Sequence, residues 1–191
     1  AAATGKPCLN LDAWAMRPAT FDAIVDRCQR SGSVVVTEGV MGLFDGATVD
    51  SGSTADIAAR TGWPVLLVVD AAGMAATIAP VVQGLAGFRA DVNVCGVIAN
   101  RTGSERHAAL LRDALERIGV PLLGHIPRDG RLALPSRHLG LVMAREHAEL
   151  EVFLEHAADV VQQHVDVDAL LDLARPAHRA QVPTSPASAA H

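Results

Sequence analysis

The hydrophobic pattern along this chain alternates between short apolar runs and helical stripes. The apolar runs 65–69 and 94–99 and the segment 122–126 have the length of strands, and the unbroken run 65–69 predicts a strand that is buried on both faces. A fourth run of β-branched residues, 34–37, predicts another buried strand. Helical spacing predicts helices over 18–28, 54–60, 74–88 and 105–118, a further helix from 146, and a short one near 167–171. Strands that alternate with helices indicate an α/β fold with a mostly parallel sheet and flanking helices.

Local signals mark where several of these helices begin and end. Ser53 or Thr54 predicts the start of the second helix, and Ser104 predicts the start of the fourth. Gly119, followed closely by a proline, ends the fourth helix. Pro80 lies inside the predicted third helix, where its missing N–H predicts a kink or break in the helix. The loops that remain include those at the carboxyl ends of the strands, where ligands bind in α/β sheets.

The loop after the first predicted strand carries candidate chemistry. The strand ends at Glu38 and leads into a segment with three glycines and a second carboxylate, Asp45. Glycines allow the backbone to approach a ligand closely, so Glu38 and Asp45 are positioned for a metal ion or a phosphate group. The alternative is that Glu38 caps a neighbouring helix and that the glycines only form turns.

Polar residues also follow the other predicted strands. Asp70 ends one strand, Asn100 and Arg101 end the next, and Pro127 and Arg128 end the last. Because the carboxyl ends of parallel strands share one edge, we expect these groups and Glu38 to lie together there, where they suit a nucleotide with Mg²⁺ better than an apolar partner. Asn100 can equally be a turn residue, because asparagine tolerates the left-handed conformation.

Composition narrows the class of protein. The chain has 191 residues, enough for one core, and 50% of them are apolar. A net charge of −5 and the absence of tyrosine argue against nucleic-acid binding. Apolar runs fall short of the roughly 20 residues that span a membrane, and three cysteines without metal-like spacing favour a reducing, cytoplasmic setting. Residues 176–191 are rich in proline, serine and alanine, which predicts a linker.

Several segments together point to one family. EGVMGLFDG (38–46) closely resembles the signature of cobyrinic acid a,c-diamide synthases, the glutamine-dependent amidotransferases of corrin biosynthesis. Four further segments are similar to that family and follow in its order: GSTAD (52–56), LLVVDAAGMA (66–75), GVIANRTGSERH (96–107) and IPRDGRLALPSRHLGLV (126–142). The resemblance covers roughly residues 1–175.

The resemblance implies a P-loop NTPase fold of the dethiobiotin-synthetase type, truncated at its N-terminus. Residues 1–175 would be part of an ATP-dependent synthetase domain, and 176–191 would lead to a glutaminase domain that supplies ammonia. ATP would phosphorylate the a and c carboxylates of a corrinoid substrate, and ammonia would then form the amides. A homodimer is compatible with this family.

The resemblance also implies roles for individual residues. Glu38 matches the family's metal-binding glutamate, which would hold Mg²⁺, and Asp45 matches a loop aspartate that handles the phosphorylated intermediate or the metal. Asn100 corresponds to the residue that hydrogen-bonds the adenine edge of ATP, with Arg101 beside it. Arginines 106, 128 and 137 can pair with the substrate's carboxylates or form surface salt bridges.

A second hypothesis stays open from the sequence. Thr4-Gly5-Lys6 is not a P-loop, because Pro7 follows the lysine and the upstream glycine is missing. The chain could therefore be a non-catalytic binding or assembly module with a P-loop-like fold that has lost its nucleotide site. The retained acidic, glycine-lined loop favours the ligase.

Overall fold

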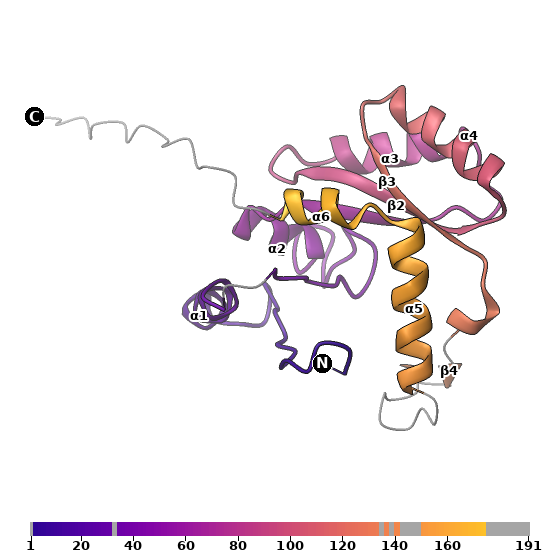
Figure 1. Cartoon of the computed structure of the whole chain (residues 1–191). Helices are drawn as coiled ribbons and strands as arrows, with labels where there is room; N and C mark the ends of the chain where they lie inside the picture. Colours follow the sequence, from indigo (N-terminus) through magenta and orange to yellow (C-terminus); the bar gives the residue numbers. More distant parts are fainter. Residues whose placement is uncertain (1, 32–33, 134–135, 138–139, 142–149, 175–191) are drawn as a thin grey trace, which may run out of the picture.

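The fold is built on a small parallel sheet. The computed structural model of the chain describes residues 2–31, 34–133, 136–137, 140–141 and 150–174. Within them, β1(Val65–Asp70), β2(Val94–Thr102) and β3(Leu122–Pro127) are hydrogen-bonded in the order β1-β2-β3, and both pairs are parallel (Figure 1). A short antiparallel pair, β4(Ser136–Arg137) and β5(Gly140–Leu141), follows. The predicted α/β class with a parallel sheet and flanking helices is confirmed.

Helices connect the strands and flank the sheet. They are α1(Pro18–Gln29), α2(Thr54–Thr61), α3(Ile78–Gly87), α4(Glu105–Glu116), the 3₁₀ turn η1(Gly130–Leu132), α5(Leu150–His164) and α6(Val167–Leu173). Figure 1 shows α3 and α4 side by side against the sheet, while α5 runs away from it. No helix among the described residues is both long and apolar enough to cross a membrane.

Capping fixes the helix that follows the acidic loop. The Ser53 side chain accepts a hydrogen bond from the N–H of Asp56, and the Asp56 carboxylate accepts one from the N–H of Ser53 at 3.0 Å. This reciprocal capping box starts α2, and Gly62, with φ of 69°, ends it in the left-handed conformation. Ser104 begins α4 by a single cap, in which its side chain accepts a hydrogen bond from the N–H of His107. The predicted helix starts at these serines are confirmed.

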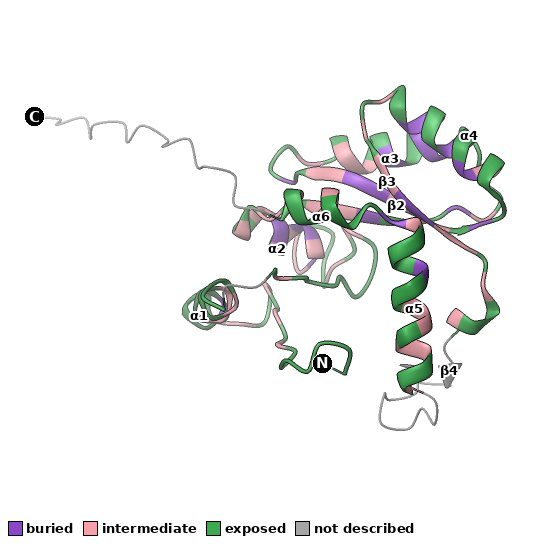
Figure 2. Ribbon diagram, in the orientation of Figure 1, coloured by how far each residue is buried: buried purple, intermediate pink, exposed green. Residues whose placement is uncertain are grey.

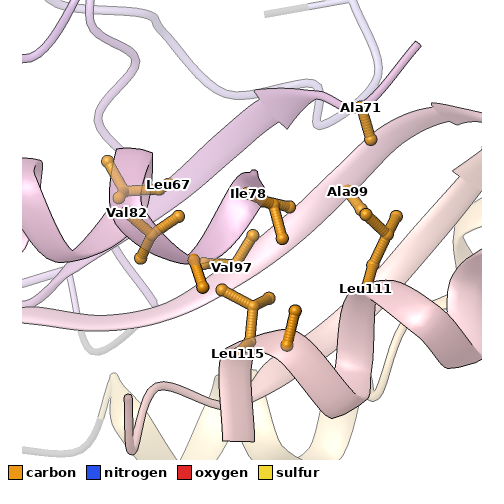
Figure 3. Close-up of a cluster of buried hydrophobic side chains, with 10 residues drawn as sticks. Leu67, Ala71, Ile78, Val82, Val97, Ala99, Leu111 and Leu115 are labelled. Carbon is orange, nitrogen blue, oxygen red and sulfur yellow. The ribbon is translucent and has the colours of Figure 1, made fainter. Parts of the chain in front are cut away.

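The core lies between the sheet and the pair α3 and α4. Figure 3 shows strand residues such as Leu67 and Val97 facing Ile78 and Val82 of α3 and Leu115 of α4. All five are buried, and the buried surface follows this layer in Figure 2. Burial of such side chains is worth about 1.5–3 kcal/mol each, so this layer holds the strand ends in register.

The predicted strand over 34–37 was wrong. The segment joins no strand within the described residues, and Val36 is 88% exposed. β-branched residues favour strands chiefly because they pack against neighbouring strands. Among the described strands none lies beside this segment, so its composition alone does not produce a strand.

Two smaller predictions also need correction. β1 is not buried on both faces, because Val68 is 65% exposed. Pro80 does not interrupt the helix, because α3 begins at Ile78 rather than near Met74. Pro80 therefore lies in the first helical turn, where backbone N–H groups have no intrahelical acceptor and proline is tolerated. The predicted start of the α5 helix at 146 and the predicted linker over 176–191 lie outside the described residues.

Candidate functional site

The sheet brings the predicted strand ends together. Asp70 on β1 is in register with Asn100 on β2, and Asn100 is in register with Ile126 on β3. Thr102 then pairs with Pro127. Asp70, Asn100 and Pro127 therefore share one edge of the sheet, as predicted. Glu38, predicted for the same edge, ends none of the described strands, so that part of the prediction was wrong.

Arg101 interrupts the ladder at this edge. The pairing of β2 with β3 passes from Asn100 directly to Thr102, so Arg101 is the extra residue of a bulge. Its φ is 60°, and it is the only non-glycine residue with positive φ in the described part of the chain. This conformation is uncommon for a residue with a long side chain. It turns Arg101 toward β1, where Nη1 lies 2.8 Å from Oδ2 of Asp70.

Asn100 presents its amide group half-buried at the same edge. Its Oδ1 accepts a hydrogen bond from the backbone N–H of Arg101 at 2.9 Å, and its backbone oxygen accepts one from Ala71 at 2.9 Å. The side-chain NH₂ group donates no hydrogen bond to any described residue. Asn100 therefore combines the local turn contact expected of asparagine with two donors that a ligand can use.

Asp45 closes a tight turn in the acidic loop. Its Oδ2 accepts a hydrogen bond from the N–H of Gly42 at 3.1 Å, and its own N–H donates to the Gly42 oxygen at 3.0 Å. A Cβ at position 42 would lie 2.5 Å from Oδ2, so only glycine fits there without displacing the carboxylate. One oxygen of Asp45 therefore shapes the loop.

Glu38 is exposed and lies in a segment without regular secondary structure before this turn. Among the described residues its carboxylate has no hydrogen bond or ion pair, and it caps none of the described helices. The neighbouring Gly39 packs on α2, since a Cβ there would lie 2.6 Å from Oγ1 of Thr54. The alternative that Glu38 caps a neighbouring helix is wrong for the described helices, since the next one along the chain, α2, is capped by Ser53 and Asp56.

The acidic loop and the strand ends are linked by packing. Within the described residues no hydrogen bond or ion pair joins Glu38 or Asp45 to the Asp70–Arg101 pair. Leu43, inside the loop, packs against the core cluster that contains Ala71 and Ala99. The oxygen of Leu43 also accepts a hydrogen bond from the Ala55 N–H of α2 at 2.9 Å. The loop is thus anchored between α2 and the core.

Other polar residues in the family-like segments have local roles. Nδ1 of His107 accepts a hydrogen bond from the Gly103 N–H at 3.0 Å, so the ring proton is on Nε2, which donates to the Met74 oxygen at 2.6 Å. His107 thereby ties α4 to the loop after β1. Arg106 and Arg128 are exposed and available to an anionic ligand, whereas the side chain of Arg137 lies outside the described residues.

The structure also assembles a cluster that the sequence did not predict. Glu105, His125 and His164 converge, with His125 Nε2 at 3.4 Å from Glu105 Oε2 and the two imidazole rings 5.0 Å apart. Burial is the main cause that lowers the pKa of His125, and Glu105 partly opposes it. The three residues are far apart in sequence and have no motif spacing, so only the fold reveals them.

Comparison with known proteins assigns the class. The sequence profile of a family described as an AAA domain matches residues 12–136, and this chain belongs to that family. No solved structure matches the chain.

Curated relatives narrow the comparison to hydrogenobyrinate a,c-diamide synthases. The chain is 54% identical over 170 residues to that of Brucella anthropi and 56% identical over 170 residues to that of Brucella suis; each match covers 88% of this chain and 39% of the relative. The relative from Rhizobium meliloti is 50% identical over 175 residues, or 92% of this chain and 41% of that protein. The chain thus spans about two fifths of the length of the curated relatives it matches, and the predicted family relationship is confirmed.

Proposed function

We propose that this chain is the ATP-dependent synthetase part of an enzyme that amidates the a and c carboxylates of hydrogenobyrinic or cobyrinic acid in cobalamin biosynthesis. The observation that carries the proposal is 54–56% identity over 170 residues to hydrogenobyrinate a,c-diamide synthases. Residues 1–175 form the synthetase part, and 176–191 link it to a glutaminase domain.

The reaction that follows is acyl activation. A carboxylate oxygen of the corrinoid attacks the γ-phosphorus of ATP, and ADP leaves. Ammonia, released from glutamine in the glutaminase domain, then attacks the acyl carbon; phosphate leaves and a proton is lost. Catalysis of phosphoryl transfer rests on positioning and on stabilising charge, which is what groups held at the edge of a rigid sheet can provide.

Asn100 and Arg101 would hold the nucleotide. The free NH₂ group of Asn100 can donate to acceptor nitrogens of adenine, while its Oδ1 is held by the N–H of Arg101 at 2.9 Å. The ion pair with Asp70 restrains the Arg101 side chain beside that amide. Base recognition by a preoriented amide costs little conformational entropy on binding.

Glu38 fits a magnesium ligand. Mg²⁺ takes hard oxygen ligands and keeps several waters, and Glu38 offers an exposed carboxylate without a partner among the described residues. Asp45 offers its second oxygen, because only Oδ2 is used by the Gly42 turn. When bound, the ion would neutralise charge on the phosphate oxygens. Glu38 is assigned to hold it, and Asp45 to orient the loop around the transferred phosphate.

The direct test uses a full-length protein that contains this sequence. Incubation with hydrogenobyrinic acid, ATP, Mg²⁺ and glutamine should give the a,c-diamide, detected by mass spectrometry, with one ADP formed for each amide. Absence of both ADP and amide from a folded protein would instead support the non-catalytic binding module. Size measurement of the same protein by light scattering tests whether it forms a homodimer.

A further inference from the structure

Two imidazoles and a carboxylate meet where three elements of the fold come together. Glu105 is the first residue of α4, His125 lies in β3, and His164 is the last residue of α5. Nitrogen and oxygen ligand atoms of all three lie within 4.8 Å of one another. The cluster contains none of the residues assigned above to ATP or magnesium.

A glycine brings the end of α5 onto β3. Gly124 forms a bridge with Val165, and the N–H of Asp166 donates to the Leu123 oxygen at 2.8 Å. A Cβ at position 124 would lie 2.9 Å from the His164 oxygen and 2.8 Å from a Val165 methyl group. Glycine at 124 therefore permits the close approach that places His164 beside His125.

Hydrogen bonds fix which nitrogen of His125 faces the cluster. The buried Thr102 hydroxyl donates to the Ile126 oxygen at 3.2 Å, so its lone pair accepts from His125 Nδ1–H, also at 3.2 Å. The proton then lies on Nδ1, and the Nε2 lone pair points toward Glu105. Metal-binding histidines are typically oriented in this way, by donating the other ring N–H to a fixed acceptor.

The separation of the ligand atoms suits a small ion. Two ligands held at roughly 2.1 Å from a tetrahedral zinc ion are about 3.4 Å apart. His125 Nε2 and Glu105 Oε2 are 3.4 Å apart. The third ligand, His164, is only half-buried and terminal on its helix, so a side-chain rotation can complete the set.

We propose that Glu105, His125 and His164 form a binding site for a divalent transition-metal ion of the zinc type. Two imidazole nitrogens with one carboxylate match zinc and its neighbours and not magnesium or calcium, which take oxygen ligands. Glu105 is 81% exposed, so one coordination position faces solvent and takes water. The site shares no residue with the proposed ATP site and does not depend on the proposed function.

The test measures metal binding to the 191-residue chain after treatment with a chelator. Co²⁺ serves as the spectroscopic probe, with Zn²⁺ added in competition, and calorimetry gives the stoichiometry. We expect one ion per chain, with visible absorption bands of tetrahedral or five-coordinate Co²⁺ that Zn²⁺ abolishes. Glu105→Gln and His164→Asn should each weaken binding by at least about tenfold.

Two further variants distinguish a specific metal site from adventitious metal binding. Thr102→Val keeps the shape of the side chain but removes the acceptor for Nδ1–H, and should weaken binding by roughly 10- to 100-fold. His156→Asn is the matched control, because His156 also contacts one carboxylate, Asp129 at 2.6 Å, but belongs to no three-ligand cluster in the described residues. Its affinity should equal that of the wild type.

Folding of each variant is checked by circular dichroism and thermal melting without metal. Weaker binding by folded Glu105→Gln and His164→Asn, with His156→Asn unchanged, supports the site. Equal affinity of these two variants and the wild type would assign any bound ion elsewhere and overturn the proposal. Absence of stoichiometric Co²⁺ binding by the wild type would overturn it as well.

Discussion

Arg101 and Asp70 join the ends of two neighbouring strands through one ion pair, with Arg101 Nη1 2.8 Å from Asp70 Oδ2. The pair depends on a left-handed backbone conformation at Arg101, whose φ is 60°. This conformation is unfavourable for arginine. Both side chains are more than half exposed, and an exposed pair contributes about 0–1 kcal/mol. Relief of the left-handed conformation by glycine is worth about 1–2 kcal/mol. The ion pair therefore fixes the position of the Arg101 side chain and adds little to the stability of the fold.

Arg101→Gly should accordingly leave the free energy of unfolding unchanged or raise it by up to about 1 kcal/mol, because glycine adopts positive φ freely. Urea denaturation of the chain measures this. The control is Arg112→Gly, at an exposed position inside α4, which should lower the free energy of unfolding by about 1 kcal/mol. Equal destabilisation by the two substitutions would contradict the strain argument.

Asn100→Asp tests base recognition in the full-length protein. The carboxylate keeps an acceptor for the Arg101 N–H but removes both donors that face a ligand. ATP binding should weaken by about 1 kcal/mol for each lost hydrogen bond, and the preference for ATP over GTP should fall. Calorimetric titration with both nucleotides measures the change.

The matched control for Asn100→Asp makes the same substitution at the opposite end of β2. Asn93 is exposed and directly precedes that strand, so Asn93→Asp should bind ATP like the wild type. An Asn100→Asp protein with unchanged nucleotide preference would show that Asn100 only shapes the turn.

Glu38→Gln tests the magnesium assignment. Loss of one ligand charge at a phosphoryl-transfer site should reduce turnover roughly 10²-fold or more, with partial recovery as Mg²⁺ is raised. The melting temperature should stay close to that of the wild type, since Glu38 has no partner among the described residues. Asp50→Asn, at another exposed acid of the same loop, should retain near-normal turnover; if both variants behave alike, Glu38 has no special role.

Ionisation of Asp56 should make the free energy of unfolding depend on pH. Burial alone would raise the pKa of Asp56, but hydrogen bonds from Arg89 and Ser53 outweigh it and hold this pKa below its ordinary value. The charged form therefore contributes stability above the unfolded pKa of about 3.9. That contribution is lost as the pH falls through the lower, folded value.

Asp56→Asn should thus lower the free energy of unfolding by about 2 kcal/mol at pH 7, the scale of a hydrogen bond to a charged group. The difference from wild type should stay constant between pH 6 and 8 and shrink below about pH 4. Asp22→Asn is the control, because Asp22 pairs with Arg60 at 2.7 Å but is 63% exposed, and should cost at most about 1 kcal/mol. A pH-independent difference for Asp56→Asn would refute the ionic explanation.

Gly124→Ala should separate the end of α5 from the sheet. The added Cβ would meet backbone and side-chain atoms of residues 164 and 165 below 3.0 Å, and such overpacking costs about 1–3 kcal/mol. Gly84→Ala is the control, since nothing lies within 4 Å of a Cβ there and the residue is inside α3. It should stabilise the chain by about 0.5–1 kcal/mol. Thermal and urea unfolding of both variants check these opposite signs.

Sequence reasoning succeeded where local chemistry decides the structure. Apolar runs and serine caps gave β1, β2, β3 and the starts of α2 and α4, because these signals act over a few residues. It failed for 34–37, since a strand also requires a neighbouring strand, which no local pattern encodes.

In the candidate site, too, some features were predicted from the sequence and others were not. The sequence predicted that Asp70 and Asn100 would lie at one edge of a parallel sheet, and the structure pairs them in register. Neither the positive φ at Arg101 nor the meeting of His125 with His164 could be read from spacing. The first depends on a bulge and the second on a contact across 39 residues that glycine at 124 permits.

The two edges of the sheet differ in what they offer to another chain segment. On the β3 side, Val165 and Asp166 occupy part of the edge through the Gly124 bridge and the bond to Leu123. Among the described strands β1 has a neighbour on one side only. Unpaired N–H and C=O groups at such an edge accept a further strand. A further strand, from the same chain or from another copy of it, would therefore add to the sheet beside β1. A charged substitution at the exposed Val68 should reduce aggregation through this edge during purification.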